Sequence, residues 1–492
     1  MNEIAARWAR GRGSLGIFKV GGVMRAYGKN TPAVLPHLAA RTALVCLLPA
    51  WMLAGTSTSL AQQIAPQADP QDFGLSVPDA PHKPGGDRLA LVKSPANELV
   101  VGKVLVEVGD HFVVVLPNGR LASVPQQEAT VTDRKFKPAT MAEMAKELTA
   151  EKFQGFKTRM TKRYLYVYNT SEPFFKATSR IVETMYPALF AYCRRQKLPV
   201  HDPETPLVMI MFRSEEEFAK YREMPEGVAA YYNGVSNHVV MYEQSKLLEI
   251  APDLAFKQAI STIAHEGVHQ ILHNIGVQQR LSSWPMWISE GLPEYFAPTS
   301  MDKGVRWKGV GLPNDLRMKE LETYLKEGGA TALARPTSEA KSLTSTGYAS
   351  AWALTHTLAE RRKDKFYAYL GDVSRLGPLE ERSAEDDAAL FAKHFGADMS
   401  EIDEQIFKNL KKLPYVDPVL NQTHYVAMLQ TAVGGRLQRS YMVTTSPKAI
   451  KDWQQQEVGG LPAGVQAGAQ MTIEAFPSQA AAVSFAKGWL GK

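Results

Sequence analysis

The sequence predicts an α+β protein: a mixed sheet with long helices, preceded by a small β-rich module and followed by a small α+β appendage. Three observations predict this class. Between about residues 155 and 415, short apolar runs typical of strands alternate with helical patterns. Strand-like runs separated by turn dipeptides fill residues 88–133, and both kinds of pattern recur after residue 416. At 492 residues, the chain is long enough for about three domains.

The excess positive charge lies in the first 61 residues. The formal net charge is +6, but residues 1–61 hold seven of the 56 basic residues and one of the 50 acidic residues, which leaves 49 of each sign in the remainder. A neutral body offers no electrostatic case for binding nucleic acid or an anionic membrane surface. We therefore expect no nucleic-acid partner, and membrane contact only through an uncleaved leader. The oligomeric state stays open.

Residues 1–61 have the pattern of a secretory signal peptide. Arg25, Lys29 and Arg41 precede the apolar run 42–54, and small residues follow as far as Ala61. A basic start, a short apolar core and a small-residue cleavage site are typical of such leaders. We expect export to the periplasm or the exterior with cleavage, and the alternative is a retained membrane anchor. Translation from Met24 instead of Met1 stays open.

One cysteine, Cys193, follows the leader. A single cysteine forms no intramolecular disulfide and no thiolate metal site. Its place in an apolar helical stretch favours a buried small hydrophobe.

Three segments come before the central region. Residues 62–87 are rich in Gln, Pro, Asp and Gly without periodicity, which predicts a solvated linker. Residues 88–133 predict a small module of SH3-like size, either a β-barrel or a curled sheet. Residues 134–154 are interpreted as a polar helical connector.

The central region, 155–415, reads as a mixed α/β arrangement. Its patterns predict strands at 164–168, 206–212 and 237–242, and helices at 175–198, from Ser214, and at 253–274. The tail, 416–492, predicts strands near residues 425, 441 and 471 with helices at 446–456 and 478–489. It forms the small α+β appendage.

The helix at 253–274 contains His265-Glu266-x-x-His269. Two histidines four residues apart lie one turn above each other on the same helix face. Their imidazoles can bind one metal ion, while Glu266 can reach a water molecule beside it.

A third ligand is expected downstream. Glu290 lies 21 positions after His269, which leaves room for a second helix to return beside the first, and Glu294 follows one helical turn later. From there a carboxylate can accept the distal N–H of a ligating histidine. If this helix starts near Glu290 or slightly later, Pro293 lies in or near its first turn. If Pro293 lies deeper, it removes a backbone donor and kinks the helix, which would misplace Glu290.

The pair His265-Glu266-x-x-His269 and Glu290-x-x-x-Glu294 resembles the gluzincin, or thermolysin-like, metallopeptidases. The surrounding residues 264–272 and 287–296 look like the peptidase-MA-like domains of exported bacterial proteins. The resemblance covers about residues 155–400. It implies a zincin-like catalytic domain, a Zn²⁺ cofactor, a peptide or protein substrate, and His265, His269 and Glu290 as ligands with Glu294 behind them.

The expected roles follow from the chemistry of peptide hydrolysis. Glu266 is the candidate general base. Tyr348 is the first candidate donor to the oxyanion, from a helix expected at 348–360, and His356 is the second. His238 and His273 are expected at the rim of the site or on the surface, and strand 237–242 is expected to be an edge that pairs with a peptide.

Two functions stay open from the sequence. The first is an exported zinc metallopeptidase. The second is a non-catalytic envelope binding or scaffold protein with a degenerate metallopeptidase domain. The intact Glu266 favours the first, because a purely structural zinc site needs no general base.

Overall fold

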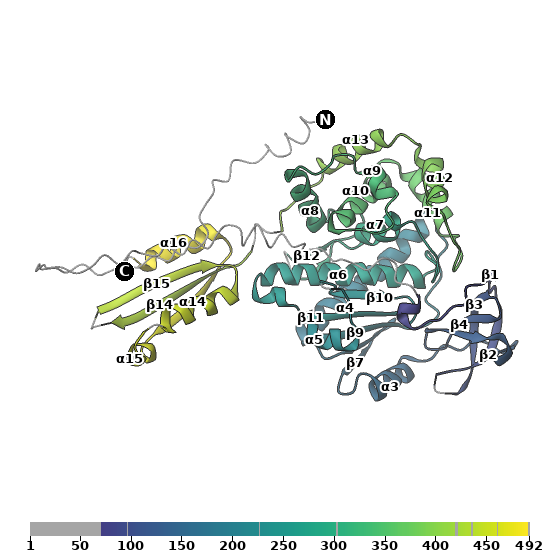
Figure 1. Cartoon of the computed structure of the whole chain (residues 1–492), viewed down its shortest axis with the longest axis horizontal. Helices are drawn as coiled ribbons and strands as arrows, with labels where there is room; N and C mark the ends of the chain where they lie inside the picture. Colours follow the sequence, from purple (N-terminus) through teal and green to yellow (C-terminus); the bar gives the residue numbers. More distant parts are fainter. Residues whose placement is uncertain are drawn as a thin grey trace, which may run out of the picture. The chain divides into compact units, whose positions relative to one another are not determined.

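The computed structural model describes residues 70–490, except residues 96, 226, 302–303, 419–421, 434–435 and 460. Its mixture of sheets and helices confirms the α+β class (Figure 1). The leader expected at 1–61 lies outside the described residues. Within them, no helix is both long enough and apolar enough to span a membrane.

The chain forms two compact units. The larger comprises the described parts of Ala61–Ser245 and Gln258–Val416, so the N-terminal β module and the central sheet belong together. The smaller comprises the described parts of Asp417–Lys492 together with Lys246–Lys257, which holds a short 3-10 helix, η3 (Lys246–Glu249).

In its described residues the N-terminal module is an open antiparallel sheet, so the closed barrel, one of the two forms expected, is not formed. Its order is β5-β4-β3-β2-β6, with β1 beside the second half of β3. Closure fails because β6 has only two residues, while the N–H of Leu121 in β5 bonds the carbonyl of Val235 outside the module. The strands are β1 (His82–Pro84), β2 (Leu89–Lys93), β3 (Leu99–Val108), β4 (His111–Val115), β5 (Leu121–Pro125) and β6 (Thr130–Val131).

The expected linker is structured from Pro70 onward. A 3-10 helix, η1 (Pro70–Phe73), leads to Leu75, which is 2% exposed and packs beneath the β module. The Phe73 ring lies 5.9 Å from that of Tyr231 in the central sheet. The Pro- and Gln-rich composition of this segment did not indicate that Phe73 and Leu75 would pack against the two sheets.

The central sheet has the order β10-β11-β9-β8-β7. Strands β8, β9 and β11 are parallel, and β10 and β7 pair antiparallel at the two edges. The bounds are β7 (Lys157–Met160), β8 (Tyr164–Tyr168), β9 (Leu207–Ser214), β10 (Ala230–Asn233) and β11 (His238–Gln244).

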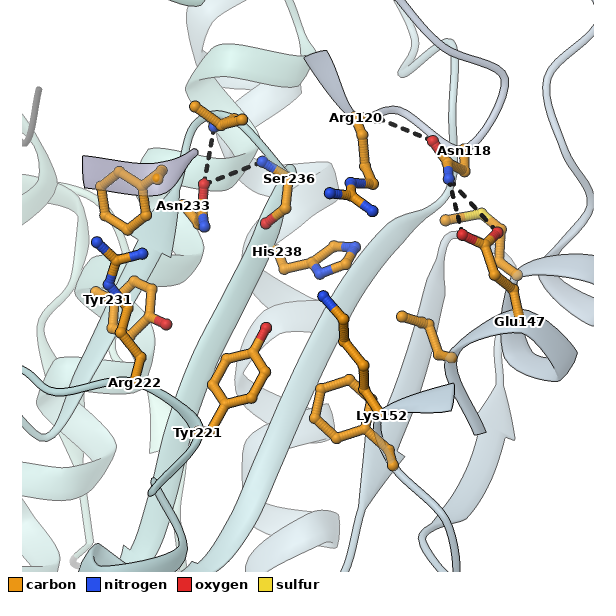
Figure 2. Close-up of a pocket in the computed structure, with 15 residues that line it drawn as sticks. Asn118, Arg120, Glu147, Lys152, Tyr221, Arg222, Tyr231, Asn233, Ser236 and His238 are labelled. Atoms are coloured by element: carbon orange, nitrogen blue, oxygen red, sulfur yellow. Dashed lines mark hydrogen bonds between the residues drawn. The ribbon is translucent and has the colours of Figure 1, made fainter. Parts of the chain in front are cut away.

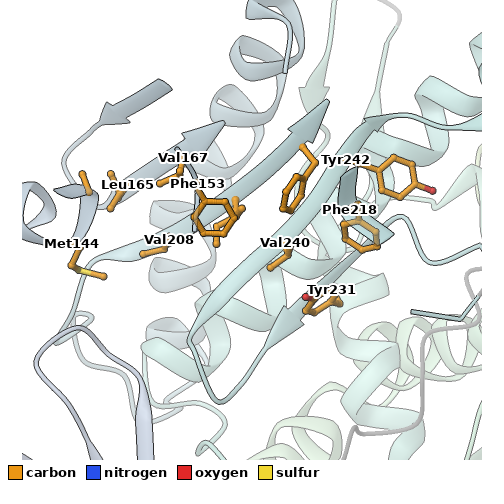
Figure 3. Packing of buried hydrophobic residues seen from close by; sticks show 12 residues of the cluster. Met144, Phe153, Leu165, Val167, Val208, Phe218, Tyr231, Val240 and Tyr242 are labelled. Carbon is orange, nitrogen blue, oxygen red and sulfur yellow. The ribbon is translucent and has the colours of Figure 1, made fainter. Parts of the chain in front are cut away.

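Helices cover both faces of this sheet. On one face, an apolar cluster that includes Phe153, Val208 and Val240 is closed by α3 (Met141–Glu151) and α5 (Glu215–Tyr221) (Figure 3). On the other face lie α4 (Glu172–Arg195) and α6 (Pro252–Asn274). Cys193 of α4 is buried as expected, and burial raises its thiol pKa to about 12.

The strand expected to be a free edge is internal. Strand β11 pairs with β9 on one side and with β10 on the other. The four-residue β10, half of whose residues are tyrosines, was not expected as a strand and forms the edge instead.

A helical layer follows α6 along the chain. Gly291 lets α7 approach α10 closely, because a Cβ there would lie 2.3 Å from Thr355 Oγ1 and 2.6 Å from the carbonyl oxygen of Ala351. The helices are α7 (Met286–Phe296), α8 (Asp315–Lys326), α9 (Ala334–Ser338), α10 (Ser345–Arg361), α11 (Lys363–Val373), α12 (Ala384–Phe395) and α13 (Met399–Leu410), with a small hairpin of β12 (Thr299–Ser300) and β13 (Arg306–Trp307).

Pro293 takes the deeper of the two positions considered for it. Helix α7 begins at Met286, so Pro293 lies two turns inside it. Glu290 nevertheless lies against the two histidines, because the buried α7 is held by its packing on α10.

In the smaller unit, β14 (His424–Val433) is paired between β15 (Arg436–Thr444) and β16 (Gln470–Phe476), all antiparallel. Alternate residues of β14 face two helices: Val426 and Met428 pack with α16 (Gln479–Leu490), and Ala427 and Leu429 with α14 (Pro447–Gly459). A short helix, α15 (Ala463–Ala467), precedes β16.

Candidate metal centre

The two motif histidines project from α6 at its closest approach to α4. A Cβ on Gly267 would lie 3.0 Å from Met185 Cε and 3.2 Å from Val182 Cγ1. Because position 267 is glycine, α6 can pack closely against α4. The opposite face of this turn, which carries both histidines, is buried under α7.

His265, His269 and Glu290 meet in one buried group. Nε2 of His265 lies 3.1 Å from Glu290 Oε2 and 3.1 Å from Nε2 of His269, and the latter lies 3.4 Å from the same carboxylate oxygen. The three predicted ligands, from two helices, are thus brought together as expected. They offer two nitrogen atoms and one oxygen atom.

The surroundings of His265 fit a group that holds a cation. Its Nδ1 lies 2.9 Å from Glu294 Oε1, although the contact is not aligned as a hydrogen bond. The negative charge of that carboxylate favours the tautomer with a proton on Nδ1, and in that tautomer Nε2 presents a lone pair to Glu290 and His269. Lone pairs on Nε2 of His265, Nε2 of His269 and Oε2 of Glu290, about 3 Å apart, repel one another unless a proton or a metal ion lies between them.

The carboxylates make the group strongly attractive to positive charge. Burial acts to lower the pKa of His265, but Glu294 and Glu290 raise it to about 10. Burial acts to raise the pKa of Glu290, but His269 and His265 hold it well below its ordinary value. Without a metal the group retains a proton, which a bound metal ion would displace.

Glu294 is held from behind by two residues that the sequence patterns did not indicate. Its Oε1 accepts a hydrogen bond from Arg317 at 2.6 Å, and its Oε2 accepts one from Asn314 at 2.8 Å. Burial acts to raise the pKa of Glu294, but Arg317 and His265 lower it to about 2. Asn314 caps α8 and Arg317 lies in its first turn, so this helix end positions the carboxylate.

Glu266 lies beside the group with one oxygen fixed and one free. Its Oε2 accepts a hydrogen bond from the backbone N–H of Tyr232 in β10 at 2.7 Å. Its Oε1 is buried and has no hydrogen-bond partner among the described residues. Burial raises the pKa of Glu266, although His265 and His269 act against it.

Tyr348 reaches the site from α10. Its ring lies 6.2 Å from that of His265 in a T-shaped contact, and the guanidinium of Arg317 lies 5.3 Å from the ring centre. Burial, Glu290 and Glu266 all raise the pKa of its phenol well above the ordinary value. The hydroxyl is therefore a neutral donor close to both carboxylates.

His356 is not brought to the group. It lies two turns further along α10, where Nε2 bonds the carbonyl oxygen of Gly311 at 3.0 Å and Nδ1 accepts from Asn409 at 2.8 Å. Both nitrogens are used in packing helices together, which removes His356 as an oxyanion donor.

A cavity of about 270 Å³ opens beside the metal group. Glu266, His269 and Glu290 line it together with Tyr232 and His273, and Phe73 of η1 forms part of its wall. His273 is thus at the rim as expected, with its ring stacked 5.2 Å from that of Tyr232. His238 is buried and lines a different cavity on the other face of the sheet.

Residues 259–380 match a family model described as a protein of unknown function, DUF1570. The match includes the three candidate ligands, Glu266 and Tyr348. A comparison with curated proteins finds no match to this chain.

Proposed function

We propose that this protein is an exported zinc-dependent peptidase of the gluzincin type. The observation that carries the proposal is the buried group of two imidazoles and one carboxylate, with the free oxygen of Glu266 directly beside it. A purely structural metal site does not need a second carboxylate with one oxygen left without a hydrogen bond.

The donor set supports zinc. Catalytic zinc sites use three protein ligands of the His₂Glu type and keep a position open. His265, His269 and Glu290 would hold the ion, which supplies Lewis-acid character and activates water near neutral pH.

Glu266 suits the role of general base. The N–H of Tyr232 fixes one carboxylate oxygen, which leaves the other available to accept a proton from the attacking water. Because burial raises its pKa, the carboxylate is a stronger base than an exposed glutamate. The same oxygen can then deliver the proton to the leaving amine.

Tyr348 suits the role of oxyanion donor. Its raised pKa keeps the hydroxyl protonated, so it can donate a hydrogen bond to negative charge that develops on the carbonyl oxygen.

A peptide substrate would lie along β10. This strand is the sheet edge, and its Tyr232 N–H already reaches Glu266, so a chain paired beside it would pass the base. Pairing through main-chain hydrogen bonds would provide affinity with little dependence on side chains.

The decisive experiment compares wild type with Glu266→Gln. Purified protein should contain one zinc per chain by elemental analysis, and it should cleave a mixed peptide library followed by mass spectrometry. We expect Glu266→Gln to retain zinc but to lose about 10²–10⁴-fold in kcat/KM. Glu404→Gln, an exposed change on α13, is the matched control and should be fully active.

Equal inertness of wild type and Glu266→Gln, with zinc bound in both, would contradict the peptidase proposal. That result would favour the envelope binding or scaffold protein with a degenerate domain.

A further inference from the structure

A second cavity, of about 240 Å³, lies on the opposite face of the sheet from α6. Its walls come from the turn that contains Asn118 and Arg120 in the β module, from α3 and the residues that follow it, and from strands β10 and β11 (Figure 2). All of these belong to the larger compact unit. None of the proposed metal ligands lines this cavity.

The cavity carries more positive than negative charge. Arg120, Lys152 and Arg222 line it, against the single carboxylate of Glu147, which accepts a hydrogen bond from Asn118 at 3.2 Å. Within the described part of the chain, neither Arg120 nor Lys152 has a carboxylate partner. Arg222 is differently placed, because its guanidinium stacks 4.0 Å from the ring centre of Phe73 and donates to the Asp72 carbonyl.

A buried arginine behind the cavity adds to this charge. Arg280 is 9% exposed and donates to the carbonyl oxygens of Gly119, Gly234 and Val235 at 2.6–2.8 Å. These partners satisfy its hydrogen bonds without neutralising it.

Several hydrogen-bond donors lie close to Arg120 and Lys152. Figure 2 shows the ring of His238 between the guanidinium of Arg120 and the ammonium of Lys152, with the hydroxyls of Tyr221 and Ser236 nearby. Burial, followed by Arg120, Arg280 and Lys152, lowers the pKa of His238 to about 3. The imidazole is therefore neutral, with one N–H to donate, in a strongly positive local field.

Apolar side chains also line the cavity. Met144, Leu148, Phe153 and Tyr231 are among them, and they belong to, or pack against, the hydrophobic cluster beneath the sheet. An occupant that satisfied the whole cavity would need an anionic head and an apolar body. A bare inorganic anion would leave this wall without a contact.

We propose that this cavity is a binding site for a small organic carboxylate. The planar guanidinium of Arg120 matches a carboxylate with two parallel hydrogen bonds, and Lys152 adds a second positive charge. His238, Tyr221 and Ser236 are placed to donate to the remaining lone pairs, while the apolar body packs against α3 and Tyr231. The site is separate from the metal centre and does not depend on the proposed peptidase activity.

The test is isothermal titration calorimetry on the full, zinc-loaded protein with three probes. Benzoate carries both features, benzamide has the same body without charge, and inorganic phosphate has charge without a body. We expect benzoate to bind with one site per chain and benzamide to bind about tenfold or more weakly, because a charge-assisted pair is lost. Phosphate should bind more weakly than benzoate.

Variants locate the site. Arg120→Gln should weaken benzoate binding by about tenfold or more, and Lys152→Gln, a change at an exposed position that leaves folding intact, should weaken it severalfold. Arg180→Gln, an exposed arginine on α4, should leave binding unchanged. Absence of benzoate binding, or unchanged binding in both cavity variants, would overturn the proposal. Phosphate binding equal to that of benzoate would also overturn it, because it would indicate a site for bare oxyanions.

Discussion

At the residue scale, Glu294 shows how a side chain outside the cavity can determine the state of the metal group. It is 1% exposed and lies between His265 on one side and Arg317 and Asn314 on the other. Its charge favours the tautomer of His265 with the proton on Nδ1, which leaves Nε2 available as a ligand. The ligand set is therefore supported by charge supplied from the start of α8.

We expect Glu294→Gln to weaken zinc binding by about 10–100-fold, because the amide cannot hold the proton and ring orientation of His265 as a carboxylate does. Competition with a chromophoric chelator measures this affinity. Glu320→Gln is the control, since Glu320 also pairs with Arg317 but does not touch His265. Equal affinities in Glu294→Gln and wild type would show that this carboxylate only fills space.

Tyr348→Phe separates catalysis from binding. Loss of a donor used only when negative charge develops on the substrate should lower kcat by about 10²–10³-fold with little change in KM. Steady-state kinetics on a cleaved peptide measures both constants. Tyr295→Phe removes a hydroxyl that bonds Glu360 away from the group and should retain kcat. A rise in KM alone in Tyr348→Phe would argue against the assigned role.

The metal ligands could be predicted because helical spacing places His265 and His269 on one face, and because Glu290 falls at a usable distance along the chain. Arg317 and Asn314 could not, because they reach Glu294 from another helix about twenty residues away and no local spacing marks them. His356 was misassigned for the same reason. The apolar helix around it was visible, but its two hydrogen-bond partners, Gly311 and Asn409, come from distant segments.

At the scale of elements, the contact between α7 and α10 places Glu290 and Tyr348 in the same site. Gly291 occupies the point of closest approach, where no side chain fits. This explains why a proline two turns inside α7 does not displace Glu290. The helix is held along its length by its neighbours and does not rely on the one backbone hydrogen bond that proline removes.

We expect Gly291→Ala to destabilise the protein by about 1–3 kcal/mol, because the two helices must move apart to admit a methyl group. Urea unfolding followed by circular dichroism measures the free energy of unfolding. Gly371→Ala in α11 is the matched control: no atom lies within 4 Å of its added Cβ, so it should be neutral or slightly stabilising. Similar values for the two variants would contradict the role given to Gly291.

Strand order was the main error at this scale. The apolar run at 237–242 correctly predicted a strand, but sequence periodicity does not reveal how many neighbours a strand has. Strand β10, which contains Tyr231 and Tyr232, was not expected, because a four-residue segment gives too short a pattern. The open form of the N-terminal module could not be predicted for a related reason. Closure into a barrel depends on the strand lengths at the two edges, and β5 pairs with Val235, which lies outside the module.

At the scale of the whole molecule, two buried histidines make stability depend on pH. Burial lowers the pKa of both His238 and His273 to about 3, while a histidine in an unfolded chain titrates near its ordinary value of about 6.5. Between these values the unfolded state binds protons that the folded state excludes. The contribution of these two histidines to stability is therefore full above about pH 6.5 and falls as the pH decreases toward 3.

We expect the free energy of unfolding of the metal-free protein to fall steadily from pH 7 to pH 5, as measured by urea titrations in the presence of chelator. His273→Gln should reduce this slope, because one of the histidines with a depressed pKa is removed. A stability that is flat over this range, or a slope unchanged in His273→Gln, would contradict the assignment.

The placement of β10 between two cavities also has a practical use. Tyr232 lines only the metal-side cavity, Tyr221 lines only the second cavity, and Tyr231 borders both. Fluorinated tyrosine introduced at each position would give three ¹⁹F resonances, each of which reports on a different cavity or on both. Zinc or a peptide should shift the first, a carboxylate should shift the second, and the third would record whether occupancy of one side is felt on the other.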